Sequence, residues 1–143
     1  MESSVNLSEI VDRFAEDMPD QQALVFEDQT ISYANLLRSI NKLSNALVKA
    51  GVKKGDRVVL LMGNRPEFVM GYYASMRIGA MAVTLNPMST AYELSHYLAD
   101  SKPAAILCNG DQVAKIETIR DRAAYLKIII STEQMDGAVT FDE

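Results

Sequence analysis

Four short runs of consecutive apolar residues recur along the chain, at residues 58–62, 80–85, 104–108 and 128–130. None of them alternates polar with apolar residues, as a strand with one face in water does. Continuous apolar runs of this length are typical of strands that are covered on both faces, the arrangement of a parallel sheet. The pattern therefore predicts four buried strands.

The stretches between these runs carry apolar residues at helical spacing. In residues 33–50 the apolar positions form one stripe, which predicts a helix with one face in water. The stripe consists of Leu36, Ile40, Leu43, Leu47 and Ala50. Gly51 follows, a residue that tolerates the left-handed backbone at a helix end. Residues 66–78 are apolar around most of the circumference, so this helix is expected to be largely buried. A further helix is expected at residues 111–124.

One spacing recurs at three expected helix starts. Asn6, Asn64 and Thr90 each stand three positions before a glutamate, which is the spacing of a capping box. In such a box the side chains accept hydrogen bonds from amide groups that have no partner inside the helix. The pattern therefore predicts helix starts near these three residues. Gly79 is expected to end the helix at 66–78.

Two further short runs, at residues 23–26 and 30–32, flank a polar turn and predict a hairpin at the edge of the sheet. Strands that alternate with helices predict an α/β fold with right-handed crossovers. We therefore expect residues 1–143 to form a single domain, a layered and mostly parallel sheet with flanking helices and an edge hairpin. A last short run near residue 140 indicates the interruption of a larger fold.

Composition and charge exclude several classes of protein. The chain has 143 residues, of which 48% are apolar, and a net charge of −5, so no basic nucleic-acid surface is expected. No apolar run reaches the length of about 18 residues that predicts a transmembrane helix. The first ten residues lack the basic start and apolar core of a secretion signal. With Cys108 as the single cysteine, a reducing compartment, the cytoplasm, is the natural interpretation.

Residues whose side chains could serve catalysis, phosphate binding or metal binding are few and scattered along the chain. Cys108 lies in an apolar run and is interpreted as a buried thiol rather than a nucleophile. His96 is the single histidine and is interpreted as a partly exposed structural residue, because a zinc site needs further ligands. Lys53 and Lys54 are interpreted as part of a solvated turn, since the glycines around them match no phosphate-binding loop.

Two groups of residues have a structural and a functional interpretation. The acids Asp12, Glu16, Asp17 and Asp20 are interpreted as a solvated face rather than as an acid–base pair, which needs a protected pocket. The methionines Met62, Met70, Met76 and Met81 are interpreted as core residues, with an apolar binding surface as the alternative. The residues by themselves therefore predict no catalytic, cofactor-binding or metal-binding side chain.

Five segments together resemble the start of the adenylate-forming family, the AMP-binding acyl-CoA synthetases and their relatives. The segments are TISYANLL at 30–37, ALVKAGVKKGD at 46–56, NRPEF at 64–68, MRIGAMAVTLNP at 76–87 and YELSHYLADSKPAAIL at 92–107. Each is weak alone, but together they follow the order and spacing of the family over residues 6–131. Asn35 departs from the glutamate that is usual in the first segment.

The resemblance implies a fold and a reaction. It implies the first subdomain of the large amino-terminal domain of an acyl-CoA ligase, rather than a peptide-synthetase module. The substrate of the full-length protein is then a fatty or other organic acid. The family joins ATP and a carboxylate into an acyl-adenylate with Mg²⁺, and the thiol of CoA then displaces AMP. The family's phosphate loop, ribose-binding aspartate and catalytic lysine lie downstream of the region matched here. No catalytic, cofactor-binding or metal-binding residue is therefore carried over, and the segment alone is expected to be inactive and to bind neither ATP, CoA nor Mg²⁺.

Two alternatives to an enzyme segment remain open at this point. One is a free-standing binding or regulatory module derived from the same subdomain. The other is a complete small α/β nucleotide-binding protein. A subdomain cut from a larger fold leaves a sheet edge or apolar helix surface uncovered, so the segment is expected to self-associate as a dimer or larger assembly.

Overall fold

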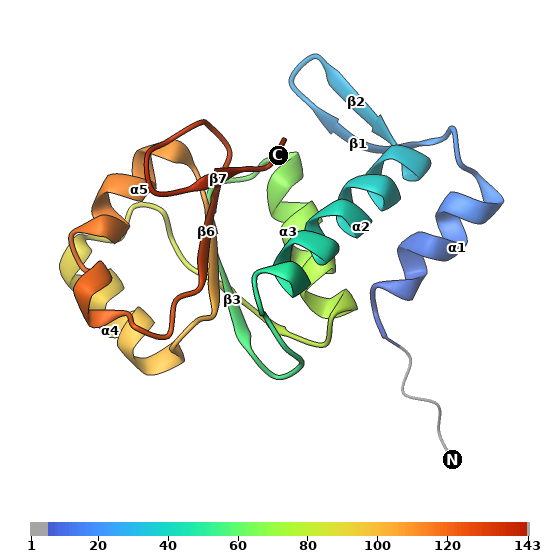
Figure 1. The fold of residues 1–143 in the computed structure, drawn as a ribbon. Helices are drawn as coiled ribbons and strands as arrows, with labels where there is room; N and C mark the ends of the chain where they lie inside the picture. The colour runs from blue at the N-terminus through green and yellow to red at the C-terminus, as the bar shows by residue number, and fades with distance from the viewer. Residues whose placement is uncertain (1–5, 143) are drawn as a thin grey trace.

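The four apolar runs form neighbouring strands of one parallel sheet in the computed structural model, which describes residues 6–142 (Figure 1). A fifth, short strand follows them, and the strand order is β4-β3-β5-β6-β7 with every pair parallel. The strands are β3 (Arg57–Leu61), β4 (Met81–Thr84), β5 (Ala105–Cys108), β6 (Ile128–Ser131) and β7 (Val139–Thr140). The expected α/β architecture is confirmed.

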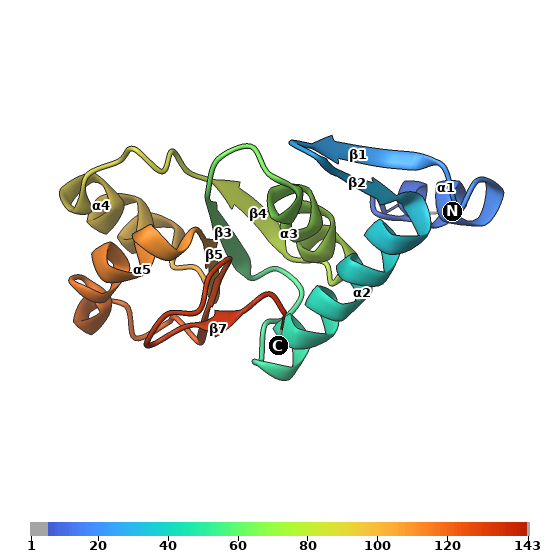
Figure 2. The same cartoon turned by 90° about the horizontal axis from the view of Figure 1, so that it is seen from above.

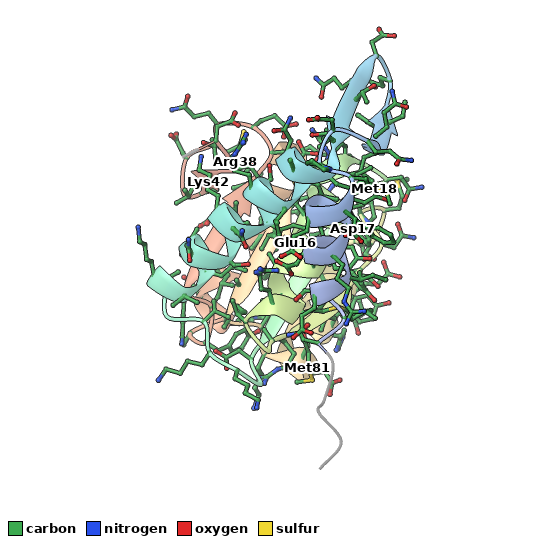
Figure 3. All side chains as sticks on the ribbon, turned by 90° about the vertical axis from the view of Figure 1, so that its right-hand side faces the viewer. Glu16, Asp17, Met18, Arg38, Lys42 and Met81 are labelled. Atoms are coloured by element: carbon green, nitrogen blue, oxygen red, sulfur yellow. The ribbon has the colours of Figure 1, made fainter. Side chains whose placement is uncertain are left out.

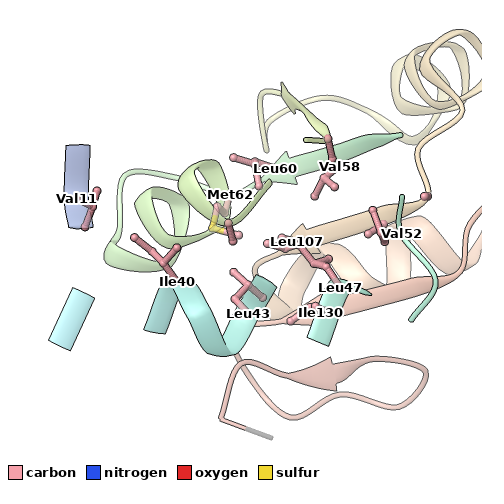
Figure 4. Close-up of a cluster of buried hydrophobic side chains, with 14 of the residues drawn as sticks. Val11, Ile40, Leu43, Leu47, Val52, Val58, Leu60, Met62, Leu107 and Ile130 are labelled. Atoms are coloured by element: carbon pink, nitrogen blue, oxygen red, sulfur yellow. The ribbon is translucent and has the colours of Figure 1, made fainter. Parts of the chain in front are cut away.

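Helices cover both faces of this sheet (Figures 1 and 2). On one face lie α2 (Tyr33–Lys49) and α3 (Pro66–Arg77), and on the other lie α4 (Ala91–Ser101) and α5 (Gly110–Glu117). Successive residues of β3 point to opposite faces, so Leu60 enters the first core and Leu61 the second. A continuous apolar run can therefore serve both cores, and Figure 4 shows the first of them.

Helix α2 has the predicted stripe and the predicted end. Leu36, Ile40, Leu43 and Leu47 are buried, whereas Ala50 is half-buried at the C-cap. Beyond it Gly51 has a φ of +92°, and the N–H of Val52 reaches back to the carbonyl of Leu47 at 3.0 Å. This is the Schellman arrangement, which satisfies carbonyls at the end of a helix.

Helix α3 matches its expected burial, since all of its residues are buried or half-buried. It ends at Gly79 in the same way as α2, with a φ of +75°. Its start differs from the prediction, because Arg65 is the N-cap and its side chain makes no cap hydrogen bond. Arg65 Nε instead donates to Glu67 Oε2 at 2.9 Å, so Glu67 is not available to Asn64 and the predicted capping box is wrong.

The other two predicted caps have opposite outcomes. Thr90 and Glu93 form the complete capping box of α4, as expected. At the first helix, α1 (Glu9–Asp17), the N-cap is Ser8 and the predicted box is wrong. Asn6 serves a different purpose: its Oδ1 accepts from the N–H of Ser8 at 3.0 Å, and its Nδ2 donates to the carbonyl of Met76 at 2.8 Å. This contact ties the start of α1 to α3.

Strand β4 is not the covered strand that its apolar run predicted. It lies at the edge of the sheet, and Met81 is 52% exposed. Met81 is therefore not a core residue, whereas Met62, at 3% exposed, is. Met70 and Met76 are half-buried. The number of partners that a strand finds depends on sheet order, which a run of apolar residues does not encode.

The hairpin forms, but away from the expected place. Strands β1 (Gln22–Phe26) and β2 (Gln29–Ser32) make an antiparallel sheet of their own, not an edge of the parallel sheet. Figures 1 and 2 show it beside α2 and α3, away from the main sheet. Leu24 and Ile31 pack against the core under α2, so the apolar side of the hairpin covers helices rather than extending the sheet.

The helix predicted at 111–124 is shorter. It ends at Glu117, and the 3-10 helix η1 (Arg120–Arg122) follows. At its end the hydroxyl of Thr118 donates to the carbonyl of Lys115 at 2.7 Å, and the N–H of Ile119 donates to the carbonyl of Ile116 at 3.0 Å. Bonds that span three residues tighten the last turn and end the α-helix.

The acidic face expected on and after α1 holds for three of its four members. Glu16, Asp17 and Asp20 are exposed, and Figure 3 shows the first two on the outside of α1. Asp12 is half-buried, and its two carboxylate oxygens accept from Arg77 at 2.7 and 2.8 Å. The hydrogen bonds from Arg77 lower the pKa of Asp12 below its ordinary value. Asp12 therefore belongs to the contact between α1 and α3.

We expect this pair to contribute about 1 kcal/mol at neutral pH, because it is bidentate but partly exposed. A lowered pKa in the folded state means that the contribution of Asp12 is present above its unfolded pKa and is lost as the pH falls through the folded pKa. Urea unfolding between neutral pH and about pH 2.5 should therefore show a weaker acid-dependent loss in Asp12→Asn than in the original chain. In the Arg77→Met background, Asp12→Asn should have little further effect, and an equal effect there would contradict the pairing.

Candidate functional site

The direction of the chain across the sheet changes between β3 and β5. From β3 the chain passes through α3 to β4 on one side, and from β5 it passes through α5 to β6 on the other. The helices that follow these two neighbouring strands therefore lie on opposite faces. In open α/β sheets, ligands bind outside the carboxyl ends of the strands at such a switch point. This edge is the first place to look for a site.

A crevice of about 470 Å³ lies at this edge. We call it the carboxyl-edge crevice. Its walls come from the loop after β3, the connection between β4 and α4, and the start of α5. They are formed by Gly63, Pro87, Met88, Asn109, Asp111, Gln112 and Lys115. Met88 is 85% exposed, so an apolar side chain stands at the rim.

Two amide side chains in the walls of the crevice have an oxygen without a hydrogen-bond partner within residues 6–142. Asn109 Oδ1 and Gln112 Oε1 are buried and accept no hydrogen bond from any residue in the described range 6–142. Gln112 is only 5% exposed, and its Nε2 donates to Asp111 Oδ2 at 3.1 Å. A buried polar atom without a partner costs about 1–3 kcal/mol, and most such atoms in proteins are paired. These two oxygens are the unsatisfied acceptors in the walls of the crevice.

Lys115 fixes one wall of the crevice. Its ammonium donates to the carbonyl of Ser89 at 2.8 Å and to that of Pro87 at 3.2 Å. These bonds tie the connection between β4 and α4 to helix α5. Two of the three N–H donors of the ammonium are thus bound to backbone carbonyls.

A network of charged side chains borders the crevice. The Glu133 carboxylate accepts from the N–H of Gly110, the first residue of α5. Arg65 Nη1 donates to Thr132 Oγ1 at 3.3 Å and to Glu133 Oε1 at 3.4 Å. The Thr132 hydroxyl above all, then the Gly110 N–H and Arg65, hold the pKa of Glu133 below its ordinary value. The network joins the carboxyl ends of β3, β5 and β6.

The residues singled out from the sequence lie outside this crevice. Cys108 is fully buried, as expected, and burial raises the pKa of its thiol to about 12. His96 is exposed on α4, with its ring against the edge of Tyr92 at 4.6 Å between centroids. Lys53 and Lys54 are exposed in the turn before β3.

Two further searches concern the part of the chain that the structure describes. Over residues 6–142, no group of three histidine, cysteine or acidic side chains converges as a metal site would require. Within the same range, no helix combines the length and the apolar character needed to cross a bilayer.

Sequence reasoning missed Asn109, Gln112, Arg65 and Glu133. A signal for two of them was present, since the polar segment NGDQ directly follows the buried strand AILC. Polar residues at the carboxyl end of a parallel strand are placed where ligands bind. Arg65 and Glu133 left no such signal, because their contact joins residues 68 positions apart.

We expect Gln112→Met to raise the free energy of unfolding by about 1 kcal/mol, because it removes a buried unpaired oxygen and keeps a similar volume. Urea unfolding of the chain measures this change. Gln134→Met is the matched control at an exposed position and should lie within about 0.5 kcal/mol of the original chain. A clear loss of stability in Gln112→Met would mean that Gln112 Oε1 has a partner in solution.

Comparisons with known proteins concern the family and the fold of the chain. The profile of a family described as AMP-binding enzyme matches residues 11–143. Indoleacetate–CoA ligase from Aromatoleum aromaticum is 30% identical over 138 residues, which cover 96% of this chain and 27% of that protein. Long-chain-fatty-acid–CoA ligase FadD13 from Mycobacterium tuberculosis is 34% identical over 96 residues, which cover 67% of this chain and 19% of that protein.

A solved structure supports the fold independently. The anthranilate CoA ligase AuaEII, in complex with anthranoyl-AMP, superposes with a TM-score of 0.90 at 24% identity over 96% of this chain and 27% of that one. At this identity the likeness concerns the fold alone. The chain spans about a quarter or less of the length of the curated relatives it matches, 17% in one case and 27% in another.

Proposed function

The chain belongs to the AMP-binding enzyme family, and on that premise we propose that it is the amino-terminal segment of an ATP-dependent acyl-CoA synthetase. The proposed reaction joins a carboxylate to ATP as an acyl-adenylate with release of pyrophosphate, and the thiol of CoA then displaces AMP. The observation that carries the proposal is the family match over residues 11–143, together with relatives that are named as acid–CoA ligases.

In this proposal the described residues serve as a scaffold for the reaction. The carboxyl-edge crevice contributes two buried amide oxygens that have no hydrogen-bond partner within residues 6–142, and the network around Arg65 and Glu133 joins the strand ends beside it. The same residues do not fit Mg²⁺ or a triphosphate. Residues 6–142 bring no three metal-ligating side chains together, and Lys115 is already bound to carbonyls. No chemical step is therefore assigned to them.

The acid substrate is proposed as a carboxylate on an apolar body. Two relatives are named for 3-hydroxybenzoate and indoleacetate, and one for long-chain fatty acids. These names support both aromatic acids and the fatty acids expected from the sequence. We place the enzyme in the cytoplasm, where ATP and CoA are available and the free thiol of Cys108 stays reduced.

The test is an assay of the protein made from its whole reading frame. With ATP, Mg²⁺ and a panel of aromatic and fatty acids, it should release pyrophosphate and, when CoA is added, form a thioester. The 143-residue chain alone should do neither. Turnover of ATP by the 143-residue chain, or no activity of the whole protein with any acid of the panel, would contradict the proposal.

We further propose that the 143-residue chain self-associates through the open edge of β4. The segment Met81–Thr84 holds neither charge nor proline, the features that usually protect an edge strand. Light scattering at rising concentration should give a mass above the 15.8 kDa of one chain. A mass that stays at one chain throughout would refute this assembly.

A further inference from the structure

A second pocket, distinct from the carboxyl-edge crevice, lies between α4 and η1. It has a volume of about 200 Å³ and belongs to the side of the sheet that α4 and α5 cover, at the left of Figure 1. Its walls are formed by Ser95, His96, Leu98, Ala99, Ile119, Arg122, Ala123 and Tyr125. We call it the α4–η1 pocket. It shares no residue with the crevice.

The pocket is apolar at its base and carries donor groups at its rim. Leu98 is 2% and Ala123 5% exposed, so both belong to its base. The guanidinium of Arg122 and the imidazole of His96 are on exposed residues, and Tyr125 is half-buried. None of the lining residues is acidic. The side-chain charge that faces the pocket is therefore positive.

These rim groups have no polar partner inside the described part of the chain. Over residues 6–142, neither the Arg122 guanidinium nor the Tyr125 hydroxyl makes a hydrogen bond or an ion pair, and His96 makes only its ring contact with Tyr92. Arg120, two positions before Arg122, differs, because it pairs with Glu117 at 2.9 Å. Burial raises the pKa of Tyr125, which keeps its hydroxyl protonated and able to donate. Three donors beside one small cavity are thus left available.

We propose that the α4–η1 pocket binds a small oxyanion, a carboxylate or a phosphate, carried on a short apolar body. A guanidinium and a phenol hydroxyl are donors suited to such oxygens. The apolar base accommodates the rest of the ligand. The volume equals that of about six or seven waters at about 30 Å³ each, which admits a single ring.

His96 makes the proposal directly testable, because it is the single histidine and gives one imidazole signal by NMR. The purified chain is titrated at constant pH and ionic strength with benzoate, phenyl phosphate and inorganic phosphate. At least one of the two ring-bearing anions should shift the His96 signal saturably with a Kd of about 1–10 mM. Inorganic phosphate should bind about threefold or more weakly, because it lacks the apolar body.

Paired variants distinguish binding in the pocket from a general effect of removing a positive charge. Arg122→Gln should weaken binding by about tenfold, and Tyr125→Phe by about threefold, since each removes donors to the anion. Arg120→Gln is the matched control: it removes the same charge from the same 3-10 helix but leaves the pocket intact, so its Kd should stay within about twofold. The ratio of the benzoate and phenyl phosphate constants identifies the preferred oxyanion. No saturable shift with either, or equal weakening by Arg122→Gln and Arg120→Gln, would overturn the proposal.

Discussion

Replacing Gly71 with alanine is expected to lower the free energy of unfolding by about 1–2 kcal/mol, although alanine favours a helix over glycine by about 1 kcal/mol. Gly71 lies in α3, where the helix packs on the sheet. An added Cβ would stand 2.7 Å from Leu107 Cδ2 and 2.9 Å from Leu60 Cδ2. Both leucines are fully buried in the core of Figure 4, so they cannot move aside without disturbing their neighbours.

Thermal or urea unfolding of the chain measures this effect. Gly63→Ala is the matched control, because nothing lies within 4 Å of the Cβ it would add. It should change stability by no more than about 0.5 kcal/mol. If Gly71→Ala were as stable as the original chain or more so, α3 would have to pack less closely on β3 and β5 than the structure shows.

Replacing Gly79 with alanine is expected to cost about 2 kcal/mol, from two separate causes. Gly79 has a φ of +75°, a conformation that costs an alanine about 1 kcal/mol or more. An added Cβ would also stand 2.9 Å from Lys54 Cγ, in the turn before β3. The glycine therefore both ends α3 and lets the turn approach it.

Gly55 separates these two causes. Its φ is +85°, but nothing lies within 4 Å of the Cβ it would gain. Gly55→Ala should therefore show only the backbone cost of about 1 kcal/mol in urea unfolding. In the Gly79→Ala background, Lys54→Ala should recover part of the loss by removing Cγ. Equal losses for Gly79→Ala and Gly55→Ala would show that Lys54 moves away without cost.

The elements of this fold were largely predictable from the sequence. The stripe of α2 and the cap at Thr90 depend on residues within a few positions of one another, and both appear where expected. The capping boxes at Asn6 and Asn64 were wrong, because the residues around them have distant or stronger partners. Asn6 bonds to Met76, and Glu67 bonds to Arg65. Local spacing predicts a helix start only where no long-range contact competes for the same side chains.

The candidate site was much less predictable than the fold. The absence of a catalytic set in residues 1–143 remains a prediction, since it concerns what these residues do in the whole protein. The crevice arises where β3 and β5 lie side by side, and these strands are separated along the chain by α3, β4 and α4. Only the folded arrangement shows that the side-chain oxygens of Asn109 and Gln112 are buried without hydrogen-bond partners within residues 6–142.

The sequence by itself determined the α/β alternation, the ends of the helices at Gly51 and Gly79 and the resemblance to a family, because these depend on residue order and short spacings. The tertiary structure alone decided that β4 is an exposed edge, that the hairpin covers helices, and that two amides and one arginine face cavities. The physical reason is that burial and hydrogen-bond partners depend on which distant segments meet. Apolar and polar patterns constrain each segment's faces but do not specify its neighbours.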